Sequence, residues 1–187
     1  MKKFKLTSEF IVDISGVKLF RIKALIEFGN VKAGDLGGYI EKEENLSHMG
    51  DAWVSDDARI SGDAQVSGNA RVSGNARVSG DTQVFGNARV FGNAWVSGNA
   101  QVSGDTQVSG DARVSGDKDY AYAHGFGSCN RTTTFFRLKD GDVGVRCGCF
   151  YGTLAQFRDK VCETHGETKK AQEYLMLADL MEIRFKN

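Results

Sequence analysis

A six-residue repeat occupies the middle of this sequence. Between Gly50 and Asp117 the unit reads G-[ND]-[AT]-x-V-[SF]. Its fifth position is aliphatic in eleven successive units, at Val54, Ile60, Val66, Val72, Val78, Val84, Val90, Val96, Val102, Val108 and Val114. A small residue stands two positions before each of these, and alternate residues of a strand share one face. The unit therefore predicts a short strand with a small and an aliphatic side chain pointing inward.

The start of each unit predicts a corner. Glycine followed by Asn or Asp tolerates a positive φ, so the chain can turn sharply there. A strand and a corner repeated in sixes stack as triangular coils of eighteen residues. An aliphatic residue followed by a small residue four positions later, as in Val54 and Ala58, resembles the hexapeptide-repeat left-handed parallel β-helix. The resemblance implies a mainly β fold built around this solenoid.

Composition agrees with an ordered solenoid. The chain has 23 glycines and no proline, and a proline would remove a hydrogen-bond donor from the ladder between coils. The 187 residues include 24 Lys and Arg against 24 Asp and Glu. This zero net charge excludes a general nucleic-acid binder. No run of about 18 apolar residues suggests a membrane span, and Glu9 and Asp13 interrupt the only apolar stretch that could resemble a signal peptide. We expect a cytoplasmic protein.

Three regions follow from these patterns. Residues 1–49 are expected to form a strand-rich cap with irregular first coils, and residues 50–127 the β-helix. Tyr120 and Phe126 continue the inward register and are expected to plug the solenoid. Residues 128–187 are expected to form a ββαα module, with strands over 132–138 and 143–150 and two helices after Thr153.

Both flanking segments resemble parts of other proteins. The segment FGNVKAGDLGGYIEKEENLS resembles the start of bacteriophage and gut-bacterial proteins that carry hexapeptide repeats. The segment GSCNRTTTFFRLKDG, followed by CGCFYGTLAQFRDKVCETHG, resembles a small domain of similar phage proteins. This likeness implies a viral or prophage origin, with the host-cell cytoplasm as the location. It carries no activity with it.

We expect no catalytic residue in this chain, because its histidines do not match those of the enzymes built on this scaffold. The acyltransferases of this fold use a histidine as general base on a loop between subunits, and the carbonic anhydrases need three zinc-binding histidines. His48, His124 and His165 all lie outside the uninterrupted repeat. We therefore predict no enzyme and no cofactor.

The cysteines predict no metal site. Cys147 and Cys149 form a C-x-C pair, with Cys129, Cys162 and His165 in the same module. Structural zinc usually needs two close pairs at C-x₂₋₄-C spacing. Buried free cysteines are expected instead.

Outward residues counted in steps of eighteen form three rows. Face one carries Arg59, Arg77, Trp95 and Arg113; face two carries Gln65, Gln83 and Gln101; face three carries Trp53, Arg71, Arg89 and Gln107. Stacked arginines repel one another, so the two arginine faces, with Phe85 and Phe91, are expected to bind an acidic or aromatic partner. A solvated surface of long side-chain stems is the alternative. The neutral glutamine row suits a contact between subunits, and the scaffold it resembles is usually trimeric, so we expect a homotrimer.

One further cluster precedes the first strand of the C-terminal module. Ser128, Asn130, Arg131 and Thr132 gather hydroxyls and a guanidinium that could hold a phosphate or nucleotide. The same groups could instead satisfy the backbone where the solenoid meets the module.

Together these patterns predict a non-catalytic binding protein of bacteriophage type. It is expected to act on a host macromolecule, with inhibition of host defence as the leading case. The alternatives are a structural or adhesive component of a phage particle, an oligomeric protein that sequesters a small nucleotide and, disfavoured, an acyltransferase.

Overall fold

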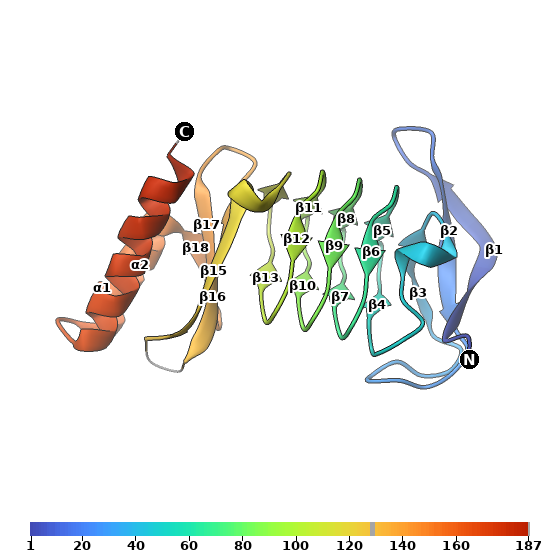
Figure 1. Ribbon diagram of the computed structural model, residues 1–187, viewed down its shortest axis with the longest axis horizontal. Helices are drawn as coiled ribbons and strands as arrows, with labels where there is room; N and C mark the ends of the chain where they lie inside the picture. The colour runs from blue at the N-terminus through green and yellow to red at the C-terminus, as the bar shows by residue number, and fades with distance from the viewer. Residues whose placement is uncertain (128–129, 187) are drawn as a thin grey trace.

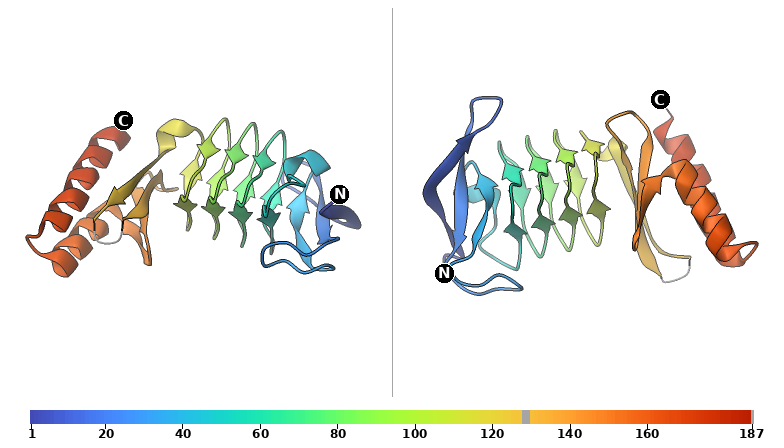
Figure 2. Two further views of the ribbon diagram at one scale, coloured as in Figure 1. Left: turned by 60° about the horizontal axis from the view of Figure 1, so that its bottom comes forward. Right: turned by 180° about the vertical axis from the view of Figure 1, so that it is seen from behind.

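A β-solenoid lies between an N-terminal β-sheet cap and a C-terminal sheet backed by two helices (Figure 1). The computed structural model describes residues 1–127 and 130–186. The two ends of the chain lie at opposite ends of the long axis (Figure 1). Figure 2 shows from two further sides that the coils stack in one direction, with the helices on the side of the C-terminal sheet away from the solenoid.

The solenoid consists of about four turns of two-residue strands, as the repeat predicted. These strands are β4 (Trp53–Val54), β5 (Arg59–Ile60), β6 (Gln65–Val66), β7 (Arg71–Val72), β8 (Arg77–Val78), β9 (Gln83–Val84), β10 (Arg89–Val90), β11 (Trp95–Val96), β12 (Gln101–Val102), β13 (Gln107–Val108) and β14 (Arg113–Val114). They pair in parallel in three ladders, β5-β8-β11-β14, β6-β9-β12 and β4-β7-β10-β13. Each partner lies eighteen residues along the chain, as between Arg71 and Arg89.

The interior of the solenoid is aliphatic. The eleven aliphatic residues of the repeat are buried, and so are the small residues that precede them. Two units have threonine in place of alanine. The Thr82 hydroxyl donates to the Ser79 carbonyl oxygen at 2.7 Å, and the Thr106 hydroxyl to the Ser103 carbonyl oxygen at 2.8 Å. These buried hydroxyls are therefore satisfied within their own corner.

Stacked corners explain why glycine recurs there. Gly68 has a φ of 66°, and a Cβ on it would lie 3.1 Å from the backbone nitrogen of Gly86 in the next coil. A side chain would thus be strained both by its own backbone and by its neighbour. Asp56 is the one repeat corner with a non-glycine residue at positive φ, at 56°.

The N-terminal cap closes the first coil. It contains β1 (Phe4–Val12), β2 (Lys18–Ala24), β3 (Leu36–Ile40) and the 3₁₀ turn η1 (Glu43–Asn45). The strands β1, β2 and β3 are antiparallel, and β3 then pairs in parallel with β5 of the solenoid. The backbone carbonyl groups of the first coil that point toward the cap therefore need hydrogen-bond donors from cap residues.

Lys3 and Asn45 are two of these donors. The buried Lys3 amino group donates to the carbonyl oxygens of Ala52 at 2.8 Å and Gly50 at 3.2 Å. The Asn45 amide donates to the carbonyl oxygens of Ala64 and Gly62, which occupy the equivalent positions two corners further along the chain. Burial lowers the pKa of Lys3 to about 8, since desolvation disfavours the ammonium form.

The backbone N–H groups of the last coil have no further coil to donate to, and the C-terminal segment supplies their hydrogen-bond acceptors. The backbone N–H groups of Gln101 and Ser115 donate to the carboxylates of Asp117 and Asp119, both at 3.0 Å. The N–H of Gln107 donates to the Thr134 hydroxyl at 3.1 Å. Amino and amide groups thus cap the first coil, and carboxylates and a hydroxyl cap the last.

The C-terminal sheet has four antiparallel strands where the sequence predicted two. They are β15 (Tyr120–Phe126), β16 (Arg131–Arg137), β17 (Val143–Cys147) and β18 (Phe150–Thr153), preceded by the 3₁₀ turn η2 (Asp117–Asp119). The expected strand over 143–150 is two strands, because Gly148 at a φ of 58° turns the chain back. Residues 120–126, assigned to the repeat segment from the sequence, pair with β16.

Tyr120 is buried against the solenoid core, as expected, but Phe126 is 44% exposed. The prediction that Phe126 plugs the solenoid is wrong, because the chain leaves the coil at η2. Phe136 of β16 takes that place and joins the solenoid core. Its neighbour Phe135 points to the other side of the sheet and joins the core beneath the helices.

Two helices cover that other side, as predicted. Helix α1 (Leu154–His165) begins with a capping box between Thr153 and Gln156. Helix α2 (Lys169–Phe185) begins at the N-cap Thr168. Their core consists of aromatic, aliphatic and sulfur-containing side chains, namely Phe135, Val145, Phe157, Val161, Ala171, Tyr174, Ala178, Met181 and Phe185.

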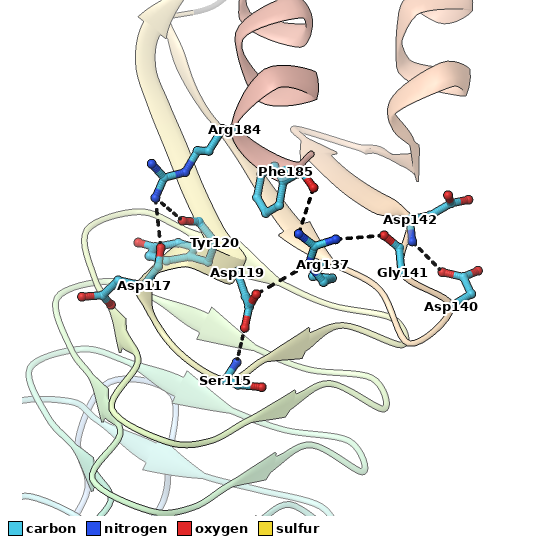
Figure 3. A network of polar contacts seen from close by, with 10 residues as sticks. All are labelled: Ser115, Asp117, Asp119, Tyr120, Arg137, Asp140, Gly141, Asp142, Arg184 and Phe185. Atoms are coloured by element: carbon cyan, nitrogen blue, oxygen red, sulfur yellow. Dashed lines mark hydrogen bonds and ion pairs between the residues drawn. The ribbon is translucent and has the colours of Figure 1, made fainter. Parts of the chain in front are cut away.

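Arg137 joins the solenoid, the sheet and the end of α2 (Figure 3). Its guanidinium lies 3.5 Å from the Asp119 carboxylate and donates to the carbonyl oxygens of Phe185 and Gly141. Arg184 donates to the Asp117 carbonyl oxygen at 3.0 Å. These contacts fix the end of α2 to the η2 turn, which caps the last coil (Figure 3).

Candidate functional site: an arginine-rich edge of the solenoid

The structure confirms the three outward rows. On face one the register aligns Arg59, Arg77, Trp95 and Arg113; on face three it aligns Trp53, Arg71, Arg89 and Gln107; on face two it aligns Gln65, Gln83 and Gln101. Neighbouring strands of a ladder lie about 4.8 Å apart. Side chains of one row are therefore direct neighbours.

The arginines of faces one and three lack acidic partners. Within residues 1–127 and 130–186, none of Arg59, Arg71, Arg77, Arg89 and Arg113 forms an ion pair. Arg113 donates to the backbone oxygens of Asn93 and Ala112. The positive charge of both rows therefore remains available to another molecule.

Asparagine stands in the middle coils of the two corner columns that flank face three. The corner column between faces three and one reads Asp57, Asn75, Asn93 and Asp111, and the Asn93 amide donates to the Asp111 carboxylate at 3.2 Å. Carboxylates stand only in its first and last coils. On the far side of face three, the column Asp51, Asn69, Asn87 and Asp105 has the same arrangement, with Asn69 bonded to Asn87 and Asn87 to Asp105.

The corner column between faces three and one, with asparagine in its two middle coils, separates two basic rows. On the face-three side lie Arg71, Arg89 and Phe91, joined by Arg146 of β17; on the face-one side lie Arg77, Trp95 and Arg113. We call these seven residues the arginine edge. Phe91 and Trp95 flank the same corner, at Gly92 and Asn93. Phe85 belongs to face two and is separate from this edge.

Cation–π contacts hold the aromatic residues of the arginine edge. The guanidinium carbons of Arg77 and Arg113 lie 6.0 and 5.7 Å from the Trp95 ring centre. That of Arg146 lies 5.5 Å from the Phe91 ring centre, and its Nε donates to the Gln107 side chain. Trp95 remains 38% exposed. The two aromatic rings space the guanidinium groups and leave apolar surface open to a partner.

Face three is hollowed at the arginine edge. A cavity of about 340 Å³ is lined by Arg71, Ser73, Arg89, Phe91, Gln107 and Arg146. No acidic residue of the described part of the chain lines it. Guanidinium groups recognise carboxylates and phosphates through paired hydrogen bonds, so this cavity is suited to an anionic group.

Sequence reasoning missed Arg146 and misplaced Trp53. Arg146 lies in the C-terminal sheet, outside the repeat, and no sequence pattern indicated that it would contact Phe91. Trp53 was expected to be exposed on face three, but it is buried. The cap loop covers it, with the Phe28 and Trp53 ring centres 5.4 Å apart. Arg59 lies beside the β1–β2 turn, in a small cavity that Asp13, Arg77 and Trp95 also line.

Face two presents the expected glutamine ladder. Gln65, Gln83 and Gln101 are all exposed. At its last coil, Gln101 lines a groove of about 510 Å³ together with Tyr122, Leu180 and Arg184. Face two therefore continues into the exposed side of α2.

The residues expected at an anion site are only partly brought together. Ser128 lies outside the described residues. Asn130 is exposed, and the Thr132 hydroxyl is hydrogen-bonded to His124 Nδ1 at 2.9 Å. Arg131 lies over the β17–β18 turn, where it lines a separate cavity of the C-terminal module.

His48 lies in the N-terminal cap, whereas His124 and His165 lie in the C-terminal module. His48 stacks on Phe4 in the N-terminal cap, where its Nδ1 accepts a hydrogen bond from the Lys3 backbone N–H and burial lowers its pKa. His165 stacks on Tyr174 in the C-terminal module. In the described ranges, no three His, Cys, Asp or Glu side chains are grouped to hold a metal ion.

The expected burial of the cysteines is wrong for two of them. Cys149 and Cys162 are exposed, whereas Cys147 is half-buried. Cys149 stands in the tight turn between β17 and β18, and Cys162 lies on the outer side of α1. Cys129 lies outside the described residues.

Comparison with known proteins supports the architecture. None of the helices in the described chain is long and apolar enough to span a membrane. No curated protein matches the chain. Residues 52–68, 64–80, 70–86 and 82–98 match a family described as YdcK Beta solenoid repeat. The central coils are therefore similar to the repeats of the YdcK β-solenoid family.

Proposed function

We propose that the protein is a non-catalytic binding protein whose arginine edge binds an acidic surface of a partner protein. This proposal rests on the guanidinium groups on both sides of a corner column that has asparagine in its two middle coils; these groups form no ion pair with any described residue. In a chain with zero net charge, such a local excess of positive charge favours an acidic patch over a long polyanion.

Trp95 and Phe91 supply the centre of the proposed contact. Interfaces owe most of their affinity to a few aromatic and arginine side chains that become fully desolvated. Here the aromatic rings lie among the arginines, so a partner that covers the rings also excludes water from the ion pairs. Exposed ion pairs alone would contribute less than about 1 kcal/mol each.

The resemblance to bacteriophage proteins supports a host macromolecule as the partner. Components of bacterial defence in the host cytoplasm are the first candidates. Face two supports a homotrimer, because Gln65, Gln83 and Gln101 can hydrogen-bond across a subunit contact without bringing like charges together. Each trimer would then present three copies of the arginine edge, which raises avidity.

A pull-down with matched variants tests the proposal. The immobilised protein is incubated with bacterial lysate beside Arg71→Gln/Arg89→Gln, and beside Lys169→Gln/Lys170→Gln, which removes the same charge at the exposed start of α2, as a control. A partner of acidic surface that the wild type and the control retain, and that the arginine variant or 0.5 M salt releases, would support it. Equal retention by all three proteins would overturn it.

A further inference from the structure

We infer that the C-terminal module binds a small amphipathic anion, with an apolar body and one acidic head group, in a cavity between its sheet and its helices. The cavity has a volume of about 240 Å³. It is lined by Arg131, Cys147, Gly148, Cys149, Phe150, Phe157, Lys160, Val161, Thr164, His165 and Tyr174. This inference is independent of the proposed function, because none of these residues belongs to the arginine edge.

The floor of the cavity is apolar and fixed. Phe157, Val161 and Tyr174 are each at most 4% exposed. The Phe157 ring centre lies 5.6 Å from that of Tyr174 and 5.5 Å from that of Phe150. The Cys147 thiol completes the wall and is already hydrogen-bonded, accepting from Thr133 at 3.2 Å and donating to the Tyr174 hydroxyl at 3.8 Å. An apolar body fits such a preformed surface.

The rim of the cavity is basic. Arg131 comes from the start of β16, Lys160 from the middle of α1 and His165 from its last residue. Among the residues that the structure describes, no Asp or Glu lines the cavity. Lys160 pairs with Glu163 at 2.9 Å on the exposed surface of α1, and such a pair is weak enough for a ligand to compete with it. The charge of the rim therefore selects an anionic head group.

Size limits the ligand further. Pockets for drug-sized molecules usually enclose about 300–1,000 Å³, so this cavity suits a smaller molecule. A medium-chain carboxylate or alkyl phosphate combines a narrow apolar chain with one acidic head. Such a molecule would place its chain over Phe157 and its head between Arg131 and Lys160.

Calorimetry with octanoate and octyl phosphate tests this inference, and their relative affinities identify the preferred head group. Octanol and butyrate are the controls for charge and for chain length. We expect at least one of the two octyl acids to bind saturably, octanol to bind at least tenfold more weakly and, if the acid is octanoate, butyrate more than tenfold more weakly than octanoate. Arg131→Gln/Lys160→Gln should lower the affinity about tenfold or more, whereas Lys169→Gln/Lys170→Gln, at the exposed start of α2, should not.

Thiol labelling gives a second measurement on the unaltered protein. Cys149 lines the cavity and Cys162 does not, although both are exposed. The bound acid should slow iodoacetamide labelling of Cys149 and leave Cys162 unchanged in peptide mass spectra. No saturable binding of either octyl acid, equal binding of octanol, or equal protection of the two cysteines would overturn the inference.

Discussion

Replacing Lys3 by methionine should weaken the start of the solenoid. The Lys3 amino group donates to the carbonyl oxygens of Ala52 and Gly50, is 1% exposed, and lies 4.7 Å from the Phe28 ring centre. Methionine keeps the apolar stem and removes both hydrogen bonds. A buried acceptor left without a partner costs about 1–3 kcal/mol. Two carbonyl oxygens lose their donor in the variant. Because the variant no longer has to bury an amino group, part of this cost is offset.

We therefore expect Lys3→Met to lower the free energy of unfolding by about 2 kcal/mol at pH 7. For a chain of this length, that corresponds to a melting temperature lower by about 4–8 °C. Lys2→Met is the matched control. Lys2 is exposed and pairs with Glu43 at 2.8 Å, a surface contact worth less than about 1 kcal/mol.

The pH dependence gives the same prediction a sharper form. The pKa of Lys3 is about 8 in the folded protein, against 10.5 ordinarily. Between these values the unfolded chain binds more protons than the folded one, so the Lys3 contribution to stability rises with pH. The difference in unfolding free energy between wild type and Lys3→Met should therefore be larger at pH 9.5 than at pH 7.

Hydrogen exchange locates the effect. The amides of Trp53 and Ser55 in the first coil donate to the second coil, and they should exchange faster in Lys3→Met than in wild type. The amide of Trp95, two coils away, should not change. The assigned role of the Lys3 amino group is wrong if Lys3→Met melts at the same temperature as Lys2→Met. It is also wrong if Lys3→Met loses the same unfolding free energy relative to wild type at both pH values.

Three other variants test the core, the assembly and the cap. Val84→Asp should cost several kcal/mol and give insoluble protein, because an unpaired carboxylate would be buried in the solenoid; Arg89→Asp, exposed on face three, should stay soluble and melt near wild type. Gln83→Glu/Gln101→Glu should give smaller particles than wild type in light scattering, since stacked carboxylates at a subunit contact repel; an unchanged mass would move the contact away from face two. His48→Gln should reduce the loss of stability expected as the pH falls below about 6.5, because the lowered pKa of His48 means that the unfolded chain takes up the proton first; chemical denaturation at pH 5 and pH 7 measures it.

The repeat made the solenoid and its outward rows predictable. One unit fixes which side chains point inward, and the eighteen-residue coil fixes which outward side chains are neighbours. This sufficed to align Arg71 with Arg89 and Arg77 with Trp95. The same periodicity placed asparagine in the central corners.

Contacts with the flanking segments could not be read from the repeat. Trp53 follows the pattern of an exposed residue, but Phe28 of the cap covers it. Phe126 follows the inward register, but the chain has already left the coil at Asp117–Asp119. Arg146 reaches Phe91 from 55 positions further along the chain. Such placements depend on tertiary packing, for which a local pattern carries no information.

The capping of both ends has a consequence for how such a protein can change in length. Lys3 and Asn45 bind whichever coil comes first, and Asp117, Asp119 and Thr134 bind whichever comes last. Eighteen residues inserted in the middle would extend the arginine edge by one step of about 4.8 Å and leave both ends unchanged. Six residues would also preserve every corner, but they would turn the C-terminal module by one third of a revolution relative to the N-terminal cap. The number of complete coils therefore sets the distance between the two ends. Any six-residue units left over after the complete coils set the relative orientation of the ends.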